Sequence, residues 1–187
     1  MTDRASGLCP DDRLQTITDL VAHDEIAGFG MVAKLLDDYP QDPRLHFLHG
    51  SLAAARQDYA TARHELREAV ALAPGYAIAR FQLGLLLLTS GEATEAEAVL
   101  QPLQDLGSEQ ALRHFASGLL LLMQDAFPEA IASLRDGLER NQDNPPLNRD
   151  MRMLIGEIEA RTGGGGEAPL SAAHLLLQQS ALKATKH

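Results

Sequence analysis

The chain has 187 residues, 45% hydrophobic and 22% charged, a composition typical of one soluble globular domain. Its 26 acidic and 16 basic residues give a formal net charge of -10, which disfavours nucleic acid and anionic membranes as partners because both select a surplus of Lys and Arg. A single cysteine, Cys9, excludes an internal disulfide and a cysteine-based zinc site, and it favours a reducing compartment.

The N-terminal residues are not expected to act as a secretory signal, because the first twelve lack the apolar stretch of about 7 to 15 residues that such a signal needs. We expect residues 1–10 to form a flexible leader. The apolar runs at 85–88 and 119–123 are far shorter than the ~20 residues that span a bilayer. The sequence therefore predicts no membrane association and a location in a bacterial-type cytoplasm.

The middle of the chain repeats with a period of 34 residues. Four columns keep this step: Phe47, Phe81 and Phe115; Gly50, Gly84 and Gly118; Ala62, Ala96 and Ala130; and Leu66, Leu100 and Leu134. Each unit has two apolar stretches at helical spacing, separated by a short polar break such as 56–58 or 90–92. Ala and Leu are abundant, so each unit predicts a helical hairpin and the chain an all-α fold.

The small residues of these columns predict how the helices of a hairpin meet. Glycine inside a helix costs about 1 kcal/mol relative to alanine, so the glycine column needs a packing reason. The alanine column, twelve residues later, provides a small partner and predicts close contact between the two helices. We expect the leucine column, one turn beyond, to fill the space between hairpins. Because a hairpin cannot bury both faces alone, each one needs a neighbour or a cap.

This period and these columns resemble the tetratricopeptide repeat family. The resemblance covers three repeats at 43–144 and a degenerate fourth unit at 9–42, and it implies a right-handed superhelix of antiparallel hairpins. The chain departs from the family pattern at His46, Arg80 and His114, where a large aromatic is expected, and at Ser108 and Gln142, where a closing proline is expected. These departures predict looser junctions and leave the columns intact.

In chain order we expect helices at 11–22 and 25–38, 43–56 and 59–72, 77–90 and 93–105, 109–124 and 127–141, and 146–161. The last alternates polar and apolar residues as a capping helix does. The domain organisation is then a leader at 1–10, a solenoid with its capping helix at 11–162, a glycine-rich linker at 163–168 and a helical tail at 169–187.

The resemblance implies that the first helix of each hairpin lines a concave groove. The apolar residues expected there are Phe47, Phe81, Leu85, Leu88, Phe115, Leu119, Leu122 and Met123. An exposed apolar patch of this size favours binding of an amphipathic helix or extended peptide; the alternative is that these residues meet one another as ordinary core. Arg44 and Arg80 lie near the groove, where they fix the polarity of a ligand or pair with surface acids.

The tail is a candidate ligand for the chain's own groove. Leu170, Ala173, Leu177 and Ala181 recur in it at helical spacing, and the glycines before it let it fold back. A short flexible tether gives an effective concentration around millimolar, so weak affinity is enough for docking. We expect the tail to dock in its own subunit or, by exchange, in a neighbouring copy. The alternative is a disordered tail or a second cap.

Other patterns predict no chemistry. His46 and His49 have the spacing of a two-ligand metal face, but no nearby Cys or carboxylate completes a site in the sequence, so packing with one hydrogen bond is expected. His64 and Glu65 are expected to share a solvent face, and no nucleophile, base and oxyanion pattern can be assembled. The glycines at 163–166 lack the flanking strand and Lys-Ser or Lys-Thr of a phosphate loop. We expect no metal, no cofactor and no catalysis.

Together these features predict a non-catalytic protein-interaction module, an adaptor or assembly factor that binds an apolar helix or peptide. Two alternatives stay open. The acidic charge, the size and the stretch at 42–50 with Arg56-Gln57 are similar to class II chaperones of type III secretion, which hold hydrophobic translocator segments, although the tail and glycine hinge are not part of that pattern. The other alternative is an accessory subunit that regulates an enzyme through the tail.

Overall fold

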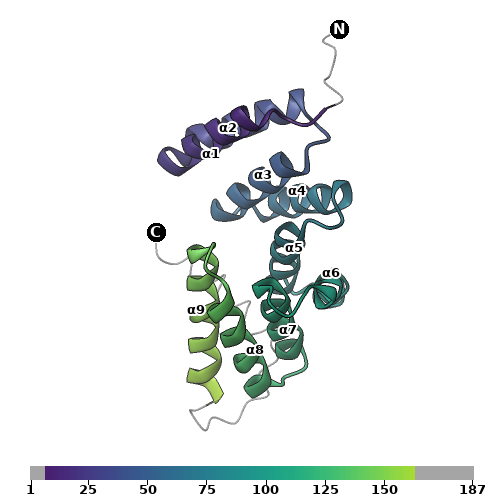
Figure 1. Cartoon of the computed structure of the whole chain (residues 1–187), viewed down its shortest axis with the longest axis vertical. Coiled ribbons are helices and arrows are strands. Elements are labelled where there is room, and N and C mark those ends of the chain that lie inside the picture. The colour runs from purple at the N-terminus through teal and green to yellow at the C-terminus, as the bar shows by residue number, and fades with distance from the viewer. Residues whose placement is uncertain (1–6, 163–187) are drawn as a thin grey trace. The chain divides into compact units, whose positions relative to one another are not determined.

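A computed structural model describes residues 7–162 (Figure 1). Every regular element in this range is a helix, which confirms the all-α prediction. The chain divides into two compact units, Met1–Leu83 and Gly84–His187, and the boundary falls inside a helix. A single solenoid over 11–162 stays a prediction. Among the described helices, none combines the length and apolar character needed to cross a membrane.

Unit 1 contains α1 (Asp11–His23), α2 (Glu25–Asp38), α3 (Pro43–Ala55), α4 (Tyr59–Leu72) and the first part of α5 (Ala77–Thr89). Aspartates begin three of these helices. The side chains of Asp24, Asp42 and Asp58 accept backbone N–H bonds in the first turns of α2, α3 and α4, at 2.9, 2.9 and 3.1 Å. These bonds satisfy donors that have no partner within a helix, and so they fix where each helix starts.

The first hairpin packs on the second through an apolar core. Ile17 of α1, Val32 of α2 and Leu52 of α3 are buried together at its centre, and half-buried residues such as Leu48 surround them. The degenerate unit at the N-terminus therefore forms a complete helix pair, although it lacks most of the repeat columns.

Unit 2 contains the rest of α5, then α6 (Ala93–Leu100), the 3-10 helix η1 (Gln101–Asp105), α7 (Ala111–Met123), α8 (Phe127–Arg140) and α9 (Pro145–Thr162). The prediction of one α-helix over 93–105 was wrong. Pro102 has no N–H to donate and its ring crowds the preceding turn, so the α-helix ends at Leu100 and the chain tightens into η1.

The three clear hairpins share one turn conformation. Gln57, Gly91 and Asp125 have φ of 64°, 82° and 57°, in the left-handed region, and they stand 34 residues apart. The repeat thus extends from side chains to the backbone itself. Glycine enters this region without strain, whereas a side chain there costs roughly 1 kcal/mol.

The glycine column marks the closest approach of the two helices in each hairpin. A Cβ placed on Gly50 would lie 3.0 Å from Leu66, one on Gly84 would lie 2.5 Å from Leu100, and the third pair is equally tight. The predicted close contact is confirmed. The leucine column was expected between hairpins, but the structure seats each leucine on the glycine of its own hairpin.

We predict that Gly118→Ala destabilises the protein. A Cβ there would stand 2.6 Å from Leu134, and overpacking of this kind costs about 1–3 kcal/mol, more than the ~1 kcal/mol that alanine returns through helix propensity. Urea unfolding measures the change. Gly30→Ala is the matched control, because a Cβ on Gly30 meets nothing within 4 Å and the variant should be more stable. Equal stabilisation by both variants contradicts the tight seat.

Candidate functional site

Most residues of the predicted groove are buried. Those with almost no exposed surface are Phe81, Leu88, Phe115, Leu119 and Leu122, whereas Phe47, Leu85 and Met123 are half-buried. Phe47 and Phe81 belong to unit 1 and the others to unit 2, so a groove common to all of them stays a prediction.

Phe115 shows what burial means for this prediction. Its ring lies directly against the backbone of Gly137, so closely that a Cβ on Gly137 would overlap it. Phe115 therefore packs inside the α7–α8 hairpin, which matches the alternative of ordinary core at this position. In unit 1, by contrast, the Phe47 ring is half-buried, with its centre 5.2 Å from that of Tyr76.

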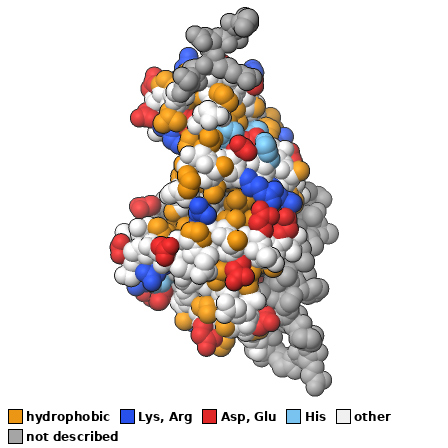
Figure 2. All heavy atoms as spheres, turned by 90° about the vertical axis from the view of Figure 1, so that its right-hand side faces the viewer, with side chains coloured by type: hydrophobic (Ala, Val, Ile, Leu, Met, Phe, Trp, Pro, Cys, Tyr) orange, Lys and Arg blue, Asp and Glu red, His pale blue; other side chains and the backbone are white. Residues whose placement is uncertain are grey.

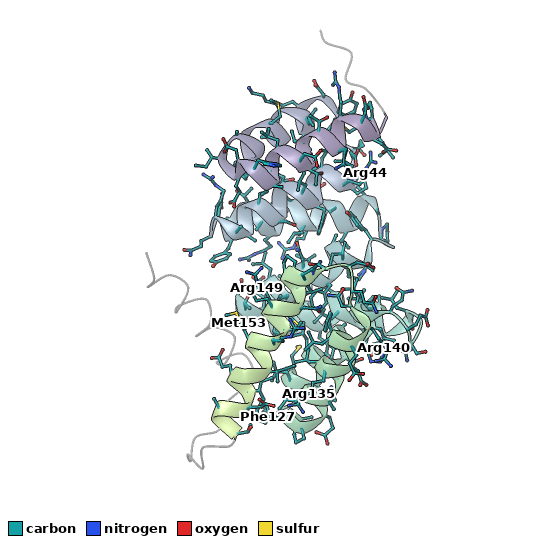
Figure 3. All side chains as sticks on the ribbon, turned by 60° about the vertical axis from the view of Figure 1, so that its left-hand side comes forward. Arg44, Phe127, Arg135, Arg140, Arg149 and Met153 are labelled. Atoms are coloured by element: carbon teal, nitrogen blue, oxygen red, sulfur yellow. The ribbon has the colours of Figure 1, made fainter. Side chains whose placement is uncertain are left out.

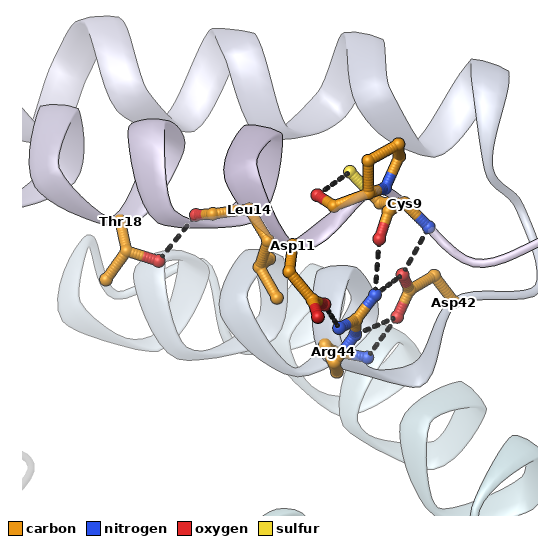
Figure 4. A network of polar contacts seen from close by, with 7 residues as sticks. Cys9, Asp11, Leu14, Thr18, Asp42 and Arg44 are labelled. Carbon is orange, nitrogen blue, oxygen red and sulfur yellow. Dashed lines mark hydrogen bonds and ion pairs between the residues drawn. The ribbon is translucent and has the colours of Figure 1, made fainter.

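Arg44, expected near the groove, is held in a polar network at the start of α3 (Figure 4). Its guanidinium donates to Asp42 at 2.8 and 3.0 Å, to Asp11 at 2.6 Å and to the carbonyl oxygen of Cys9 at 2.6 Å. Two roles were predicted for Arg44, orienting a ligand and pairing with acidic side chains, and the structure shows the pairing. The guanidinium of Arg80, the second expected arginine, donates to the carbonyl oxygen of Pro74 at 2.9 Å.

The same network holds Cys9, near the end of the leader that the sequence predicted at 1–10. Cys9 is only 1% exposed, and its backbone N–H donates to the buried carboxylate of Asp42 at 2.8 Å. Burial opposes the charged form of Asp42, but hydrogen bonds from Arg44 outweigh it and lower the pKa of this carboxyl. Burial raises the pKa of the Cys9 thiol, so this side chain is neutral and packed rather than reactive.

A half-buried carboxylate joins two histidines between α3 and α4. Nδ1 of His46 lies 2.6 Å from Oε2 of Glu65, and Nε2 of His46 lies 3.1 Å from the carbonyl oxygen of Pro40. Nδ1 of His49 lies 3.3 Å from Oε1 of Glu65. Figure 2 shows histidine and acidic side chains next to one another near the N-terminal end of the face that it presents.

Burial and hydrogen bonding act in opposite directions on this cluster. Burial disfavours both charges, but the hydrogen bond between the partners outweighs it. The pKa of His46 is therefore raised above 6.5, and that of Glu65 is lowered from 4.5 to about 2. The pair is charged at mildly acidic pH and stabilises the α3–α4 hairpin.

His49 fills the space between this carboxylate and α2. Its ring stacks on Phe29 with 4.6 Å between centres, and the Arg56 guanidinium carbon lies 4.9 Å from the centre of that same Phe29 ring. Among the described residues, neither ring nitrogen of His49 has a hydrogen-bond partner of good geometry. Its ring therefore packs on Phe29 and lies beside the Glu65 carboxylate, where it helps to lower the pKa of Glu65.

Sequence reasoning missed Glu65, which was expected on a solvent face with His64. The signal was available in the hairpin geometry. Residues at equal distances from the turn of an antiparallel hairpin lie opposite one another; His49 stands eight residues before Gln57, and Glu65 eight after it. No group of three or more His, Cys, Asp and Glu side chains in the described part of the chain is arranged to hold a metal ion.

The outer face of α2 carries an exposed apolar stripe that the sequence analysis also missed. The side chain of Ile26 is 76% exposed and that of Met31 is 44% exposed. Ala27 and Gly30 are exposed between them. Gly30 follows Ile26 by four residues, and Gly30 and Met31 follow Ala27 by three and four, so the four residues share one helical face. We call these four residues the α2 stripe. Its chemistry suits association with another apolar surface.

A family model described as tetratricopeptide repeat matches residues 47–111 and 115–181. The two matches together cover more than half of the chain. A search of curated proteins finds no match.

Solved structures share the fold at low sequence identity. The MamA 41-end fragment from Desulfovibrio magneticus RS-1 has a TM-score of 0.60 at 15% identity, covering 96% of this chain and 99% of its own. The MamA RS-1 ArsTM double mutant has a TM-score of 0.58 at 14% identity, covering 97% and 100%. YrrB, described as a TPR protein with an unusual peptide-binding site, has a TM-score of 0.55 at 18% identity, covering 91% and 89%.

We predict that the stabilisation by the His46–Glu65 pair is lost both when the pH is raised and when it is lowered. A raised histidine pKa gives stability that is complete below 6.5 and is lost as pH rises through the folded-state value. A lowered carboxyl pKa gives stability that is complete above 4.5 and is lost as pH falls towards 2. The contribution should therefore be largest between 4.5 and 6.5. Urea unfolding of the wild type and Glu65→Gln across pH measures it; parallel profiles contradict the prediction.

We predict that Phe115→Ala lowers the free energy of unfolding by about 3–5 kcal/mol, the usual cost of truncating a buried aromatic. The reason is its burial against Gly137 inside the α7–α8 hairpin. Phe127→Ala, a half-buried position at the start of α8, is the control and should cost less. Denaturant unfolding compares the two. A Phe115→Ala variant of unchanged stability that loses partner binding speaks for a ligand anchor instead.

Proposed function

The chain belongs to the tetratricopeptide repeat family, and on that premise we propose that it is a non-catalytic adaptor that binds a protein or peptide through the α2 stripe. The family supports protein or peptide binding as the class of function. The observation that carries the location is the exposed apolar surface of Ile26 and Met31.

The α2 stripe is suited to a partner because its side chains are apolar and largely exposed. Ile26 and Met31 leave much of their apolar surface in water, and burying it against a partner is favourable by roughly 25 cal/mol per Å². Gly30 has open space where a side chain would stand, which lets a partner backbone or side chain approach the helix closely. These are the properties of the centre of a small interface.

The charges around the α2 stripe define the partner's chemistry. Glu25 precedes the stripe, while Asp37 and Asp38 follow it, and all three are exposed. Lys34 is the one basic side chain on this helix. An amphipathic helix with an apolar face and a rim of Lys or Arg complements this surface, because opposite charges at the rim favour encounter and orientation.

The predicted groove contributes less in this proposal. Phe47 in unit 1, and Leu85 and Met123 in unit 2, keep some exposed surface for a ligand. YrrB is described by its peptide-binding site, which supports a peptide as the ligand class for a protein of this fold. We propose these three residues as secondary contacts within their own units.

We predict that Ile26→Asp combined with Met31→Asp abolishes partner capture and leaves folding intact. Both side chains are exposed, so the substitutions remove apolar contact and place charges against the partner's apolar face without disturbing the core. The measurement is co-purification from the native host with tagged protein, with helix content and unfolding midpoint checked in parallel. Gln142→Asp, on the exposed segment after α8, is the control for added charge. Recovery of the same partners by all the proteins contradicts the proposed surface.

A further inference from the structure

Among the described residues, only one face of α9 packs against another element. Leu147, Met151, Leu154 and Ile158 are buried along it, and α9 lies against α8. Asn148 locks this arrangement: its side chain donates to the carbonyl oxygen of Asn141 at 2.8 Å and accepts from the Asn141 amide at 2.8 Å. The rotation of α9 about its axis is therefore set, and with it the identity of the residues that point away.

The other face of α9 is an exposed stripe of small and apolar residues. Met153 is 51% exposed, and Gly156 and Ala160 follow at i+3 and i+7, with Arg149 one turn before (Figure 3). A Cβ on Gly156 would meet nothing within 4 Å. A glycine in the middle of an 18-residue helix, with no neighbour that requires it, is unexplained by the described residues.

The same spacing occurs on α7, where it is fully used. Phe115, Gly118 and Leu122 are spaced as Met153, Gly156 and Ala160 are, and all three are buried. Gly118 receives Leu134 of α8, and Phe115 lies against Gly137. The exposed face of α9 thus has the same spacing about a central glycine as the face with which the first helix of a hairpin receives the second, with Met153 and Ala160 where α7 has Phe115 and Leu122.

The sequence after α9 contains the matching half. In α8 the residues that face α7 are Ala130, Leu134 and Gly137, spaced by four and three. Ala173, Leu177 and Ser180 repeat this spacing and its order of small, large and small side chains. The family model supports the pairing, because its first match covers two hairpins and its second, of similar length, runs on to residue 181.

We propose that residues 170–183 form the second helix of a further hairpin and dock on the exposed face of α9 in the same chain. Leu177 then seats on Gly156 as Leu134 seats on Gly118, and the small Ser180 lies opposite Met153. The residues between Thr162 and Leu170 are rich in glycine and long enough to close the hairpin. The four tail residues predicted as a ligand, Leu170, Ala173, Leu177 and Ala181, lie outside the described residues, and this proposal places Ala173 and Leu177 on α9 and not in the concave groove.

Cysteine pairing tests the register. In a full-length Cys9→Ala background, Gly156→Cys with Leu177→Cys should form an intrachain disulfide under mild oxidation at least tenfold faster than Gly156→Cys with Leu177→Ala and Gln179→Cys. The reason is that position 179 lies on the opposite side of the tail helix, and a disulfide needs Cβ atoms within about 4.5 Å. Equal rates overturn the proposal. A dimer band as the main product also overturns it, because the occupant is then a second copy.

A side chain placed at Gly156 gives a second, independent test. The change in Tm has one sign if the tail docks on α9 and the opposite sign if this face is open to water. In the full chain, Gly156→Leu should lower the Tm and increase protease cleavage after Thr162, because the new side chain occupies the place of Leu177. If the face of α9 is open to water, the same substitution raises the Tm, because leucine favours helix over glycine. A rise in Tm therefore overturns the proposal. Both experiments concern α9 alone, so their failure leaves the proposed role of the α2 stripe untouched.

Discussion

The architecture depends on one contact that recurs in every clear hairpin, the seating of a leucine from the second helix on a glycine backbone in the first. Only a glycine allows the helices to come this close, and the leucine then fills the gap that the missing side chain leaves. Other pairs follow from this approach. His46 reaches Glu65, and Phe115 reaches Gly137, because the helices that carry them are already held together nearby.

Charge has a structural role at the start of α3. Asp42 is completely buried, and its carboxylate accepts hydrogen bonds from the Cys9 backbone and from the backbone and side chain of Arg44. A buried carboxylate is tolerated only when its oxygens are satisfied in this way. The network connects the segment before α1 to the second hairpin. Arg44, which the sequence suggested as a ligand contact, therefore holds two parts of the fold together.

The sequence predicted the elements well because their signals are local or periodic. The 34-residue columns located the hairpins, and the glycine column located the close contacts. Exposure was harder to predict, since it depends on what lies opposite a residue. Phe81 and Phe115 have the pattern of groove residues and are buried, while Ile26 and Met31 belong to no repeat column and are exposed. Glu65 was misplaced because only the pairing of α3 with α4 shows that it faces two histidines.

The left-handed turns at Gln57, Gly91 and Asp125 show which positions of the repeat restrict the type of residue. Three different residues hold nearly the same φ within one chain, so the backbone there is imposed by the helices on either side and not by the local side chain. A side chain is tolerated at such a position for roughly 1 kcal/mol, whereas a change at a glycine or leucine seat disrupts the packing of the hairpin. A repeat of this kind is therefore recognisable from its helix contacts long after its turns have diverged.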